Sequence, residues 1–379
     1  MLLPVLASAA LILAAPFMGL LRTWLGEVFQ GSFVTFMAGA IGTAVAAVAL
    51  AALVRIRTRR LARFATIALA LAIAAVYSRV MSTGSAQVDI VERVHFIEYG
   101  VVTFLFYRAW RPAADVSVIV LPILAGIVVG TLEEWFQWFI PNRVGELRDI
   151  ALNLVAVVCG LTISIALTPP ARVAVPLSPV SRRRVAVALA CVIASVTFFV
   201  DQIHLGHEIR AEGFSFRSHW NATQLAALAA DRTARWQTDP PITWRRLSRE
   251  DQYMDEGLWH ARRRNQRWDE KHHEGAWQEN RILEIYFAPV LDTPSYVSGG
   301  HRWPAAIRDE AQRAAAHSTR PSDQAARALS GQAGTYTSDA QPYPIALVPR
   351  WLWRLGAAIA IGAIVMLSFA AGGRFGGRD

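Results

Sequence analysis

The sequence predicts an all-α fold: a polytopic bundle of about eight membrane helices, with a mainly helical water-soluble domain inserted before the last one. The chain of 379 residues is 54% hydrophobic and only 18% charged, whereas soluble proteins average about 25% charged residues. Half of all the charged residues lie between residues 206 and 349. The rest of the chain consists of apolar stretches that approach the ~20 residues needed to cross a bilayer.

Each apolar stretch predicts one membrane helix, and the expected helices span residues 2–21, 33–54, 64–81, 94–110, 116–140, 150–168, 185–204 and 351–371. The first stretch could instead be a signal peptide. It lacks a basic n-region, however, and exceeds the usual h-region of about 7–15 residues, so we expect a retained helix. Residues 1–82 then hold three helices, 83–168 three more, 169–205 the seventh, and 350–379 the eighth with a C-terminal tail.

Arginines in the short loops predict the orientation of the chain. They follow the second, fourth and sixth helices and end the chain, at Arg55, Arg57, Arg59, Arg60, Arg63, Arg108, Arg111, Arg172, Arg182, Arg183, Arg184, Arg374 and Arg378. All these positions fall on one side of an eight-helix path, which the positive-inside rule makes cytoplasmic. We therefore expect both termini in the cytoplasm of a bacterium, a multi-pass protein of its inner membrane, and residues 206–349 outside.

The net charge of +9 does not indicate a nucleic-acid partner, because the basic excess lies in those short loops. Residues 206–349 contain equal numbers of basic and acidic side chains. The two cysteines, Cys159 and Cys191, both fall within apolar segments, so no disulfide framework is expected.

The soluble block shows helix-length runs with few breakers and no clear strand alternation. We expect a helical extracytoplasmic domain over 206–317 and a flexible tether, rich in Ser, Gly, Gln, Thr and Pro, over 318–349. Tyr253, His260 and Arg264 share one helix face, which either lines a groove for a sugar or peptide or forms a small core. His204 and His207 lack a third ligand, so no metal site is predicted.

Polar side chains concentrate in the fourth to sixth expected helices, where each charged group costs about 2.5–3.5 kcal/mol on insertion. Three pairs lie one helical turn apart, and one arginine lies in the loop before the last pair: His95 and Tyr99, Glu134 and Gln137, Arg143, then Asp149 and Asn153. Because successive helices run in opposite directions, all of them fall at one depth near the outer boundary. We expect one shared polar site, or else hydrogen bonding between helices without a ligand.

Other charged residues nearby are expected to lie in the interface, where charge is cheap. These are Glu92, Arg93, Arg148 and Glu133. On a continuous fourth helix, Glu92 would share the face of His95 and Tyr99, and Glu98 would point away from it. Ala156 and Gly160 continue the Asn153 face as a small-residue stripe, which lets helices approach closely.

In this order and spacing, the polar residues resemble the VanZ-like membrane family. The pattern is His-aromatic-x-x-Tyr at 95–99, Glu-x-x-Gln at 134–137, Pro-x-Arg at 141–143, and Asp149 with Asn153 four residues later. The resemblance covers about 88–167. Glu92 replaces a lysine found in many members, and Ala156 replaces a glycine. The resemblance implies action on the cell envelope, since founding members are associated with low-level resistance to the glycopeptide teicoplanin.

The functional expectation is a membrane protein that binds, and could modify, an amphiphilic or lipid-linked cell-wall ligand at the outer leaflet. Glu134 would be the base or anchor, His95 the acid, and Arg143 the anion clamp, with Asp149 in the catalytic set. Asp149, Asn153 and Gln137 would orient these groups, and Tyr99, Gln137 and Asn153 would contact the ligand. No cofactor is expected. The alternatives are a non-catalytic assembly or sensor protein that contacts an envelope partner through residues 206–317, and a proton-coupled transporter.

Overall fold

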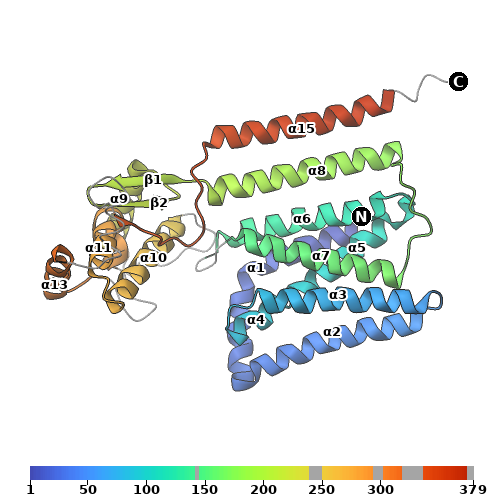
Figure 1. Ribbon diagram of the computed structural model, residues 1–379, viewed down its shortest axis with the longest axis horizontal. Coiled ribbons are helices and arrows are strands. Elements are labelled where there is room, and N and C mark those ends of the chain that lie inside the picture. Colours follow the sequence, from blue (N-terminus) through green and yellow to red (C-terminus); the bar gives the residue numbers. More distant parts are fainter. Residues whose placement is uncertain (141–144, 239–249, 293–301, 318–335, 374–379) are drawn as a thin grey trace. The chain divides into compact units, whose positions relative to one another are not determined.

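The computed structural model describes residues 1–140, 145–238, 250–292, 302–317 and 336–373, and the chain divides into two compact units. The membrane unit contains residues 1–137, 145–199 and 354–379, and the soluble unit contains 138–144 and 200–353. Most described residues are helical, as the sequence predicts (Figure 1). Each unit is described separately below.

Long apolar helices build the membrane unit. They are α1 (Leu2–Phe29), α2 (Phe33–Arg55), α3 (Arg60–Val80), the short α4 (Ala86–Glu92), α5 (His95–Trp110), α6 (Ser117–Gln137), α7 (Leu147–Leu167), α8 (Pro179–Phe199) and α15 (Arg350–Gly373). Among the described residues, six helices are long and apolar enough to cross a membrane, namely α2, α3, α6, α7, α8 with the turn that follows it, and α15. The chain therefore has the character of a multi-pass membrane protein.

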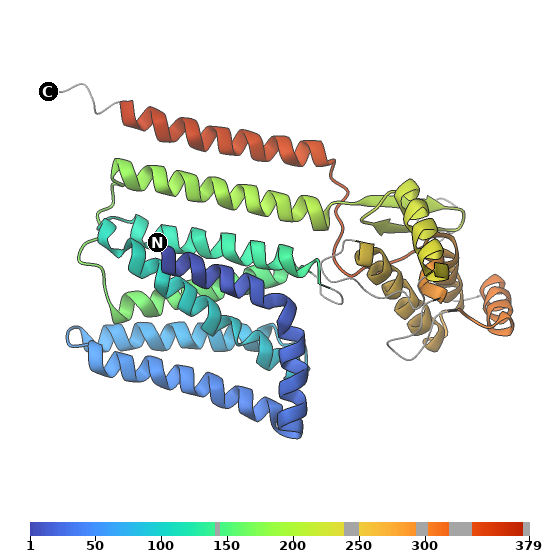
Figure 2. The same cartoon turned by 180° about the vertical axis from the view of Figure 1, so that it is seen from behind.

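The first and fourth expected helices are not among these six. In α1, the apolar part Leu2–Met18 is short, and the helix contains Pro16 and bends along its length (Figure 2). A proline inside a helix removes a backbone hydrogen bond and kinks it. In α5, only 16 residues are helical, and His95, Glu98 and Arg108 lower its apolarity.

The fourth expected helix also starts later than its sequence indicates. The chain forms α4 up to Glu92, makes a turn, and begins α5 at His95. The expectation that Glu92 shares a helix face with His95 and Tyr99 assumed a continuous helix, which this turn interrupts. Instead, the carboxylate of Glu92 lies 3.3 Å from the guanidinium of Arg148, which also donates a 2.7 Å hydrogen bond to the carbonyl of Met81. Neither glycine nor proline marks this break in the sequence.

Helices α5, α6 and α7 form the centre of the membrane unit, and α1 packs against α5 and α6. Their shared core includes Val102, Phe106, Val129 and Val157. A Cβ atom placed on Gly160 would lie 2.7 Å from the Cα atom of Gly100, so these two glycines allow α5 and α7 to touch. This confirms the predicted close approach along the Ala156–Gly160 stripe.

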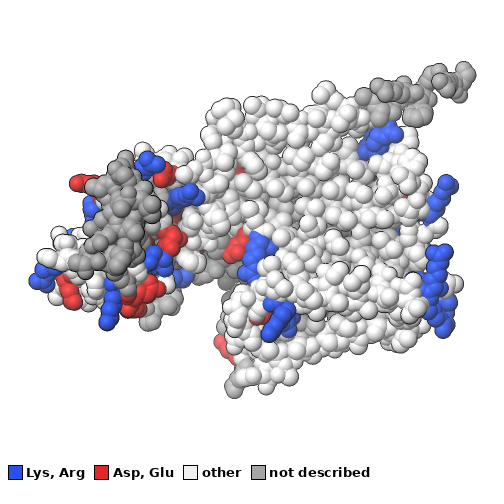
Figure 3. Space-filling view, viewed as in Figure 1, with Lys and Arg blue, Asp and Glu red and all other residues white. Residues whose placement is uncertain are grey.

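The turns that join α2 to α3, α5 to α6 and α7 to α8 lie at the same end of the membrane unit (Figure 1). Lysine and arginine side chains gather on the surface at that end (Figure 3). The helices themselves present an almost uncharged surface between the two ends, as expected for helices that face hydrocarbon.

The soluble unit contains a small sheet that the sequence analysis missed. Strands β1 (His207–Ala211) and β2 (Phe214–Ser218) form an antiparallel hairpin, and β3 (Tyr336–Thr337) pairs with β2 in parallel. The order of the strands is β1-β2-β3. The sequence of β2, Phe-Ser-Phe-Arg-Ser, does alternate, but over only five residues, and four of the five are buried, so the short alternation was overlooked.

Part of the expected tether is folded. Besides β3, residues Ala340, Tyr343 and Ile345 are buried, and Ala346 pairs with Leu205 in an isolated bridge. The prediction of a tether over 318–349 is therefore wrong for 336–346, and 318–335 lies outside the described residues. Composition suggested a linker there, but three apolar side chains are enough to anchor the segment on the domain core.

Helices α9 (Ala222–Thr238), α10 (Glu250–Asp269), α11 (His273–Tyr286), α12 (Ala288–Asp292) and α13 (Ala305–Ala316) complete the soluble unit. Its core joins Phe214 and Phe216 of the hairpin to Tyr253, Leu283 and Phe287 of the helices. Tyr253, His260 and Arg264 on α10 are at most 1% exposed. Of the two interpretations of that helix face, the structure supports a core.

Candidate functional site

A network of hydrogen-bonded polar side chains is buried between α5 and α6. The hydroxyl of Tyr99 donates a 2.5 Å hydrogen bond to Oε2 of Glu133. Nε2 of Gln137 donates to Oε1 of Glu134 at 3.0 Å and to Oε1 of Glu133 at 3.3 Å. Oε2 of Glu134 accepts a 3.2 Å hydrogen bond from the backbone N–H of Glu146. None of the four side chains is more than 5% exposed.

Local helix geometry brings these residues together. Glu133, Glu134 and Gln137 lie in the last turn of α6, where residues three and four apart are neighbours. Tyr99 lies one turn into α5 and faces them. Glu133 was expected in the interface, and that expectation is wrong, because its carboxylate is buried and bound to Tyr99. Helical spacing favoured Glu134 over its neighbour as the inward carboxylate, and the structure buries both.

Asn153 brings α7 to the same place. Its side chain is 1% exposed, and within the described residues neither its Oδ1 nor its Nδ2 atom has a hydrogen-bond partner. A Cβ atom on Gly130 of α6 would lie 3.3 Å from Nδ2 of Asn153 and 3.4 Å from the hydroxyl of Tyr99. The lack of a side chain at Gly130 therefore lets the amide and the phenol crowd together against α6.

The remaining expected site residues lie at or beyond the edge of this network. Nδ1 of His95 lies 3.6 Å from Oε2 of Glu98, and its ring centroid is 6.2 Å from that of Tyr99. Glu98 was expected to point off the face of His95 and Tyr99, yet its carboxylate lies near the imidazole of His95. Asp149 is half-buried in the first turn of α7. Arg143 lies outside the described residues, so the structure does not place the expected anion clamp.

We call Tyr99, Glu133, Glu134, Gln137 and Asn153 the polar cluster. Two carboxylates bridged by one glutamine amide can accept hydrogen bonds or a proton from a hydroxyl, amine or phosphoric acid group. The amide of Asn153 adds a donor and an acceptor for a ligand. No group of three or more metal-ligating side chains occurs among the described residues.

A second buried polar network lies inside the soluble unit, where sequence analysis identified only His260. Nδ1 of His260 lies 2.7 Å from Oε2 of Glu279, and both side chains are 0% exposed. Oε1 of Glu279 accepts hydrogen bonds from Tyr336 at 2.7 Å and Ser338 at 2.5 Å. This network ties β3 to the helical core. Its other members, Glu279, Tyr336 and Ser338, come from distant segments, so no local spacing in the sequence links them to His260.

Burial also perturbs the acids next to this network. Desolvation raises the pKa of Glu256 to about 7, against the opposing effects of the Ser218 hydrogen bond and of His260. Desolvation likewise raises the pKa of Asp255 to about 6. In the histidine pair at 204 and 207, Nδ1 of His204 lies 2.9 Å from the carbonyl oxygen of Pro344.

Comparisons of the chain with models of protein families, with curated proteins and with solved structures found no match.

Proposed function

We propose that this chain is a VanZ-like protein of the bacterial inner membrane that binds an amphiphilic or lipid-linked envelope ligand at the polar cluster. The hydrogen-bonded set of Tyr99, Glu133, Gln137 and Glu134 is the observation that carries the proposal. Two carboxylates inside a membrane bundle are costly, and such groups persist where they serve a ligand or proton path.

The convergence of residues distant in the sequence supports this proposal. Tyr99, the Glu134–Gln137 pair and Asn153 come from three separate segments of the resembled pattern, and they lie together in space. Glu134 is the ligand anchor or base in this proposal, and His95, next to Tyr99, is the proton donor. Gln137 orients Glu134 through its 3.0 Å hydrogen bond.

The orientation of the site is also part of the proposal. With eight crossings, including α1 and α5, the arginine-rich turns lie in the cytoplasm, and the polar cluster lies at the opposite end of α5 and α6. The ligand is then reached from the outer leaflet, and residues 206–349 are extracytoplasmic. Glycopeptides act at this side of the membrane, so a changed teicoplanin susceptibility is the expected phenotype.

The alternative function is a non-catalytic assembly or sensor protein that recognises an envelope partner through its soluble unit. This alternative is favoured by the independent core of that unit, which joins the hairpin to α9, α10, α11 and α12. In that case, substitutions on the exposed surface of α13 should abolish function, and the polar cluster should tolerate change. No described feature favours the transporter hypothesis over these two.

The test compares wild type with Glu134→Gln in a glycopeptide-sensitive Gram-positive host, at matched membrane levels. Glu134→Gln keeps the size of the side chain and removes its charge. We expect the wild type to raise the inhibitory concentration of teicoplanin, measured beside vancomycin, and Glu134→Gln to lose that protection. The control Glu27→Gln alters an exposed carboxylate on α1 and should protect fully. Protection by Glu134→Gln equal to wild type would remove the polar cluster from the function.

A further inference from the structure

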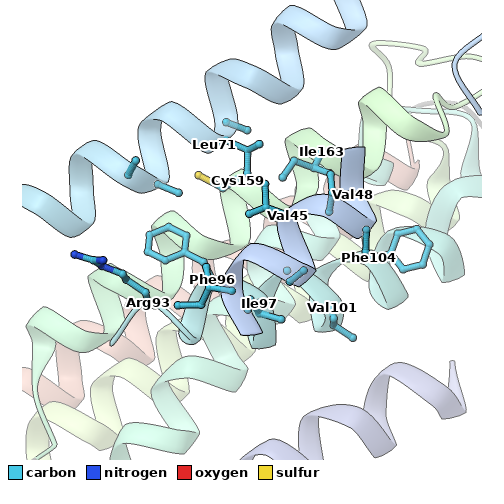
Figure 4. A pocket seen from close by; sticks show the side chains of 18 of the residues that line it. Val45, Val48, Leu71, Arg93, Phe96, Ile97, Val101, Phe104, Cys159 and Ile163 are labelled. Atoms are coloured by element: carbon cyan, nitrogen blue, oxygen red, sulfur yellow. The ribbon is translucent and has the colours of Figure 1, made fainter. Parts of the chain in front are cut away.

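The membrane unit contains a large cavity that shares no residue with the polar cluster. It has a volume of about 750 Å³ and is lined by α2, α3, α5 and α7 (Figure 4). Ligand sites in proteins usually measure ~300–1,000 Å³, so this cavity can hold a molecule or part of one. Figure 4 shows Arg93 at one end of the cavity and Phe104 at the other.

The wall of the cavity is apolar and open to the membrane. Small residues create the space, namely Ala44, Ala47, Ala70, Ala74, Gly100 and Gly160. Val45 and Val101 lie at its margin and are 40% and 53% exposed, so this side faces hydrocarbon in a bilayer. From Ala70 to Arg79, α3 runs along the cavity for about 14 Å, close to half of the ~30 Å hydrocarbon core. One acyl chain of one leaflet has this length.

Among the described residues that line the cavity, the charged side chains are two arginines, Arg79 of α3 and Arg93 just before α5. Among the described residues, neither guanidinium has a hydrogen bond or an ion pair. The nearby carboxylate of Asp89 is close enough to be influenced by the charge of Arg93, but its hydrogen bonds come from Ser82 and Thr83. A guanidinium in this position binds phosphate oxygens strongly, through paired N–H groups.

The positive-inside pattern does not account for these two arginines. Arg79 lies at the C-terminal end of α3, and the arginine-rich turn lies at the N-terminal end of the same helix. Arg93 likewise precedes α5, whose far end carries Arg108 and Arg111. An apolar cavity one leaflet deep, with two cations at its mouth, matches an anionic lipid in both shape and charge.

We propose that this cavity is a binding site for an anionic phospholipid, with one acyl chain between α2, α3, α5 and α7 and the phosphate on Arg79 and Arg93. The proposal does not depend on the function of the polar cluster or on which side of the membrane is cytoplasmic. In this proposal the protein selects the lipid in the cavity by its charge, whereas it does not select among the lipids that surround its other helices.

The test measures which lipids the purified full-length chain retains. The protein is reconstituted with equal amounts of phosphatidylglycerol and phosphatidylcholine, extracted in mild detergent, and analysed by native mass spectrometry. We expect one retained phosphatidylglycerol in the wild type, preferred about tenfold or more over phosphatidylcholine, a ratio that corresponds to 1.4 kcal/mol or more. Arg79→Gln combined with Arg93→Gln should abolish the preference. Ala74→Phe should fill the cavity and abolish retention of either lipid.

Matched controls separate the cavity from general effects. Ala72→Phe adds the same ring to an exposed position of α3, and Arg57→Gln combined with Arg59→Gln removes two charges at the other end. Both should keep the wild-type preference, and so should Glu134→Gln, which separates this site from the polar cluster. The proposal would be overturned if the wild type showed no preference for phosphatidylglycerol, or if the double arginine variant kept that preference. Both results can be read even if Ala74→Phe fails to fold.

Discussion

At the scale of single residues, buried acids in this chain are held in two different ways. Glu133 and Glu134 lie in the membrane unit and share the donor Gln137, and Glu133 also accepts a hydrogen bond from Tyr99. Glu279 lies in the soluble unit and is bound by His260 and two hydroxyl groups. Removing one partner from such a network leaves a buried group unsatisfied, which costs about 1–3 kcal/mol or more for a charged group. Each network therefore fixes the helices that carry it.

Glu256 gives the soluble unit a predicted pH dependence. Its pKa of about 7 exceeds the ordinary value, so the folded state binds more protons than the unfolded state between about pH 4.3 and 7. The free energy of unfolding should therefore fall as the pH rises through this window, by on the order of 3 kcal/mol. Thermal unfolding followed by tryptophan fluorescence should give a lower Tm at pH 8 than at pH 5.

The variant Glu256→Gln isolates that contribution, because the neutral amide cannot titrate. Its Tm should change less between pH 5 and pH 8 than that of the wild type. The control Glu310→Gln alters an exposed carboxylate on α13 and should keep the wild-type dependence. An unchanged dependence in Glu256→Gln would assign the effect to other groups, with Asp255 the first to examine because burial raises its pKa in the same direction.

At the scale of elements, the packing of α5 on α7 depends on two glycines. In Gly160→Ala, the new methyl group would meet the backbone of Gly100 at 2.7 Å, and backbone cannot move aside as a side chain can. We expect a loss of about 1–3 kcal/mol from overpacking, measured as a lower Tm in detergent. Gly39→Ala on α2 has open space around it and should leave the Tm unchanged or raise it slightly. Equal stability of both variants would contradict this packing.

The helices were easier to predict from sequence than their ends or the strands. Apolar stretches identified α2, α3, α6, α7, α8 and α15, because burial in hydrocarbon requires an uninterrupted run. The break between α4 and α5 carries no glycine or proline, and the ion pair of Glu92 with Arg148 joins residues 56 positions apart. Strand β3 is two residues long and pairs with a strand more than a hundred residues earlier. Such contacts between distant segments leave no local pattern.

In the polar cluster too, local spacing predicted some contacts, and contacts between helices could not be predicted. Helical spacing predicted that Glu134 and Gln137 share a wall, and the structure joins them at 3.0 Å. The predicted helices also placed Tyr99 at about the same membrane depth as Glu134 and Gln137. It could not predict the role of Glu133, because a bond to Tyr99 depends on how α5 packs against α6. The role of Gly130 also depends on how helices pack, because its lack of a side chain leaves room for Asn153 of α7.

At the scale of the whole molecule, the proposed orientation predicts which surfaces a reagent can reach in intact cells. In a background with Cys191 replaced by serine, Asp309→Cys places a thiol on the exposed surface of α13, and Arg57→Cys places one in the turn after α2. A membrane-impermeant maleimide should label Asp309→Cys in intact cells and Arg57→Cys only after lysis, because charged reagents do not cross the hydrocarbon core. The reverse pattern would invert the proposed topology.

The central claim is that the polar cluster is a binding site, and the thermal stability of Asn153→Leu tests it most directly. Leucine keeps the branched shape of asparagine and removes a buried amide that has no hydrogen-bond partner among the described residues. If the amide serves a ligand, its loss should leave the Tm of the purified chain unchanged or raise it, since an unsatisfied buried polar group costs about 1–3 kcal/mol. A clear fall in the Tm would contradict the claim, because the amide would then hold the helices together.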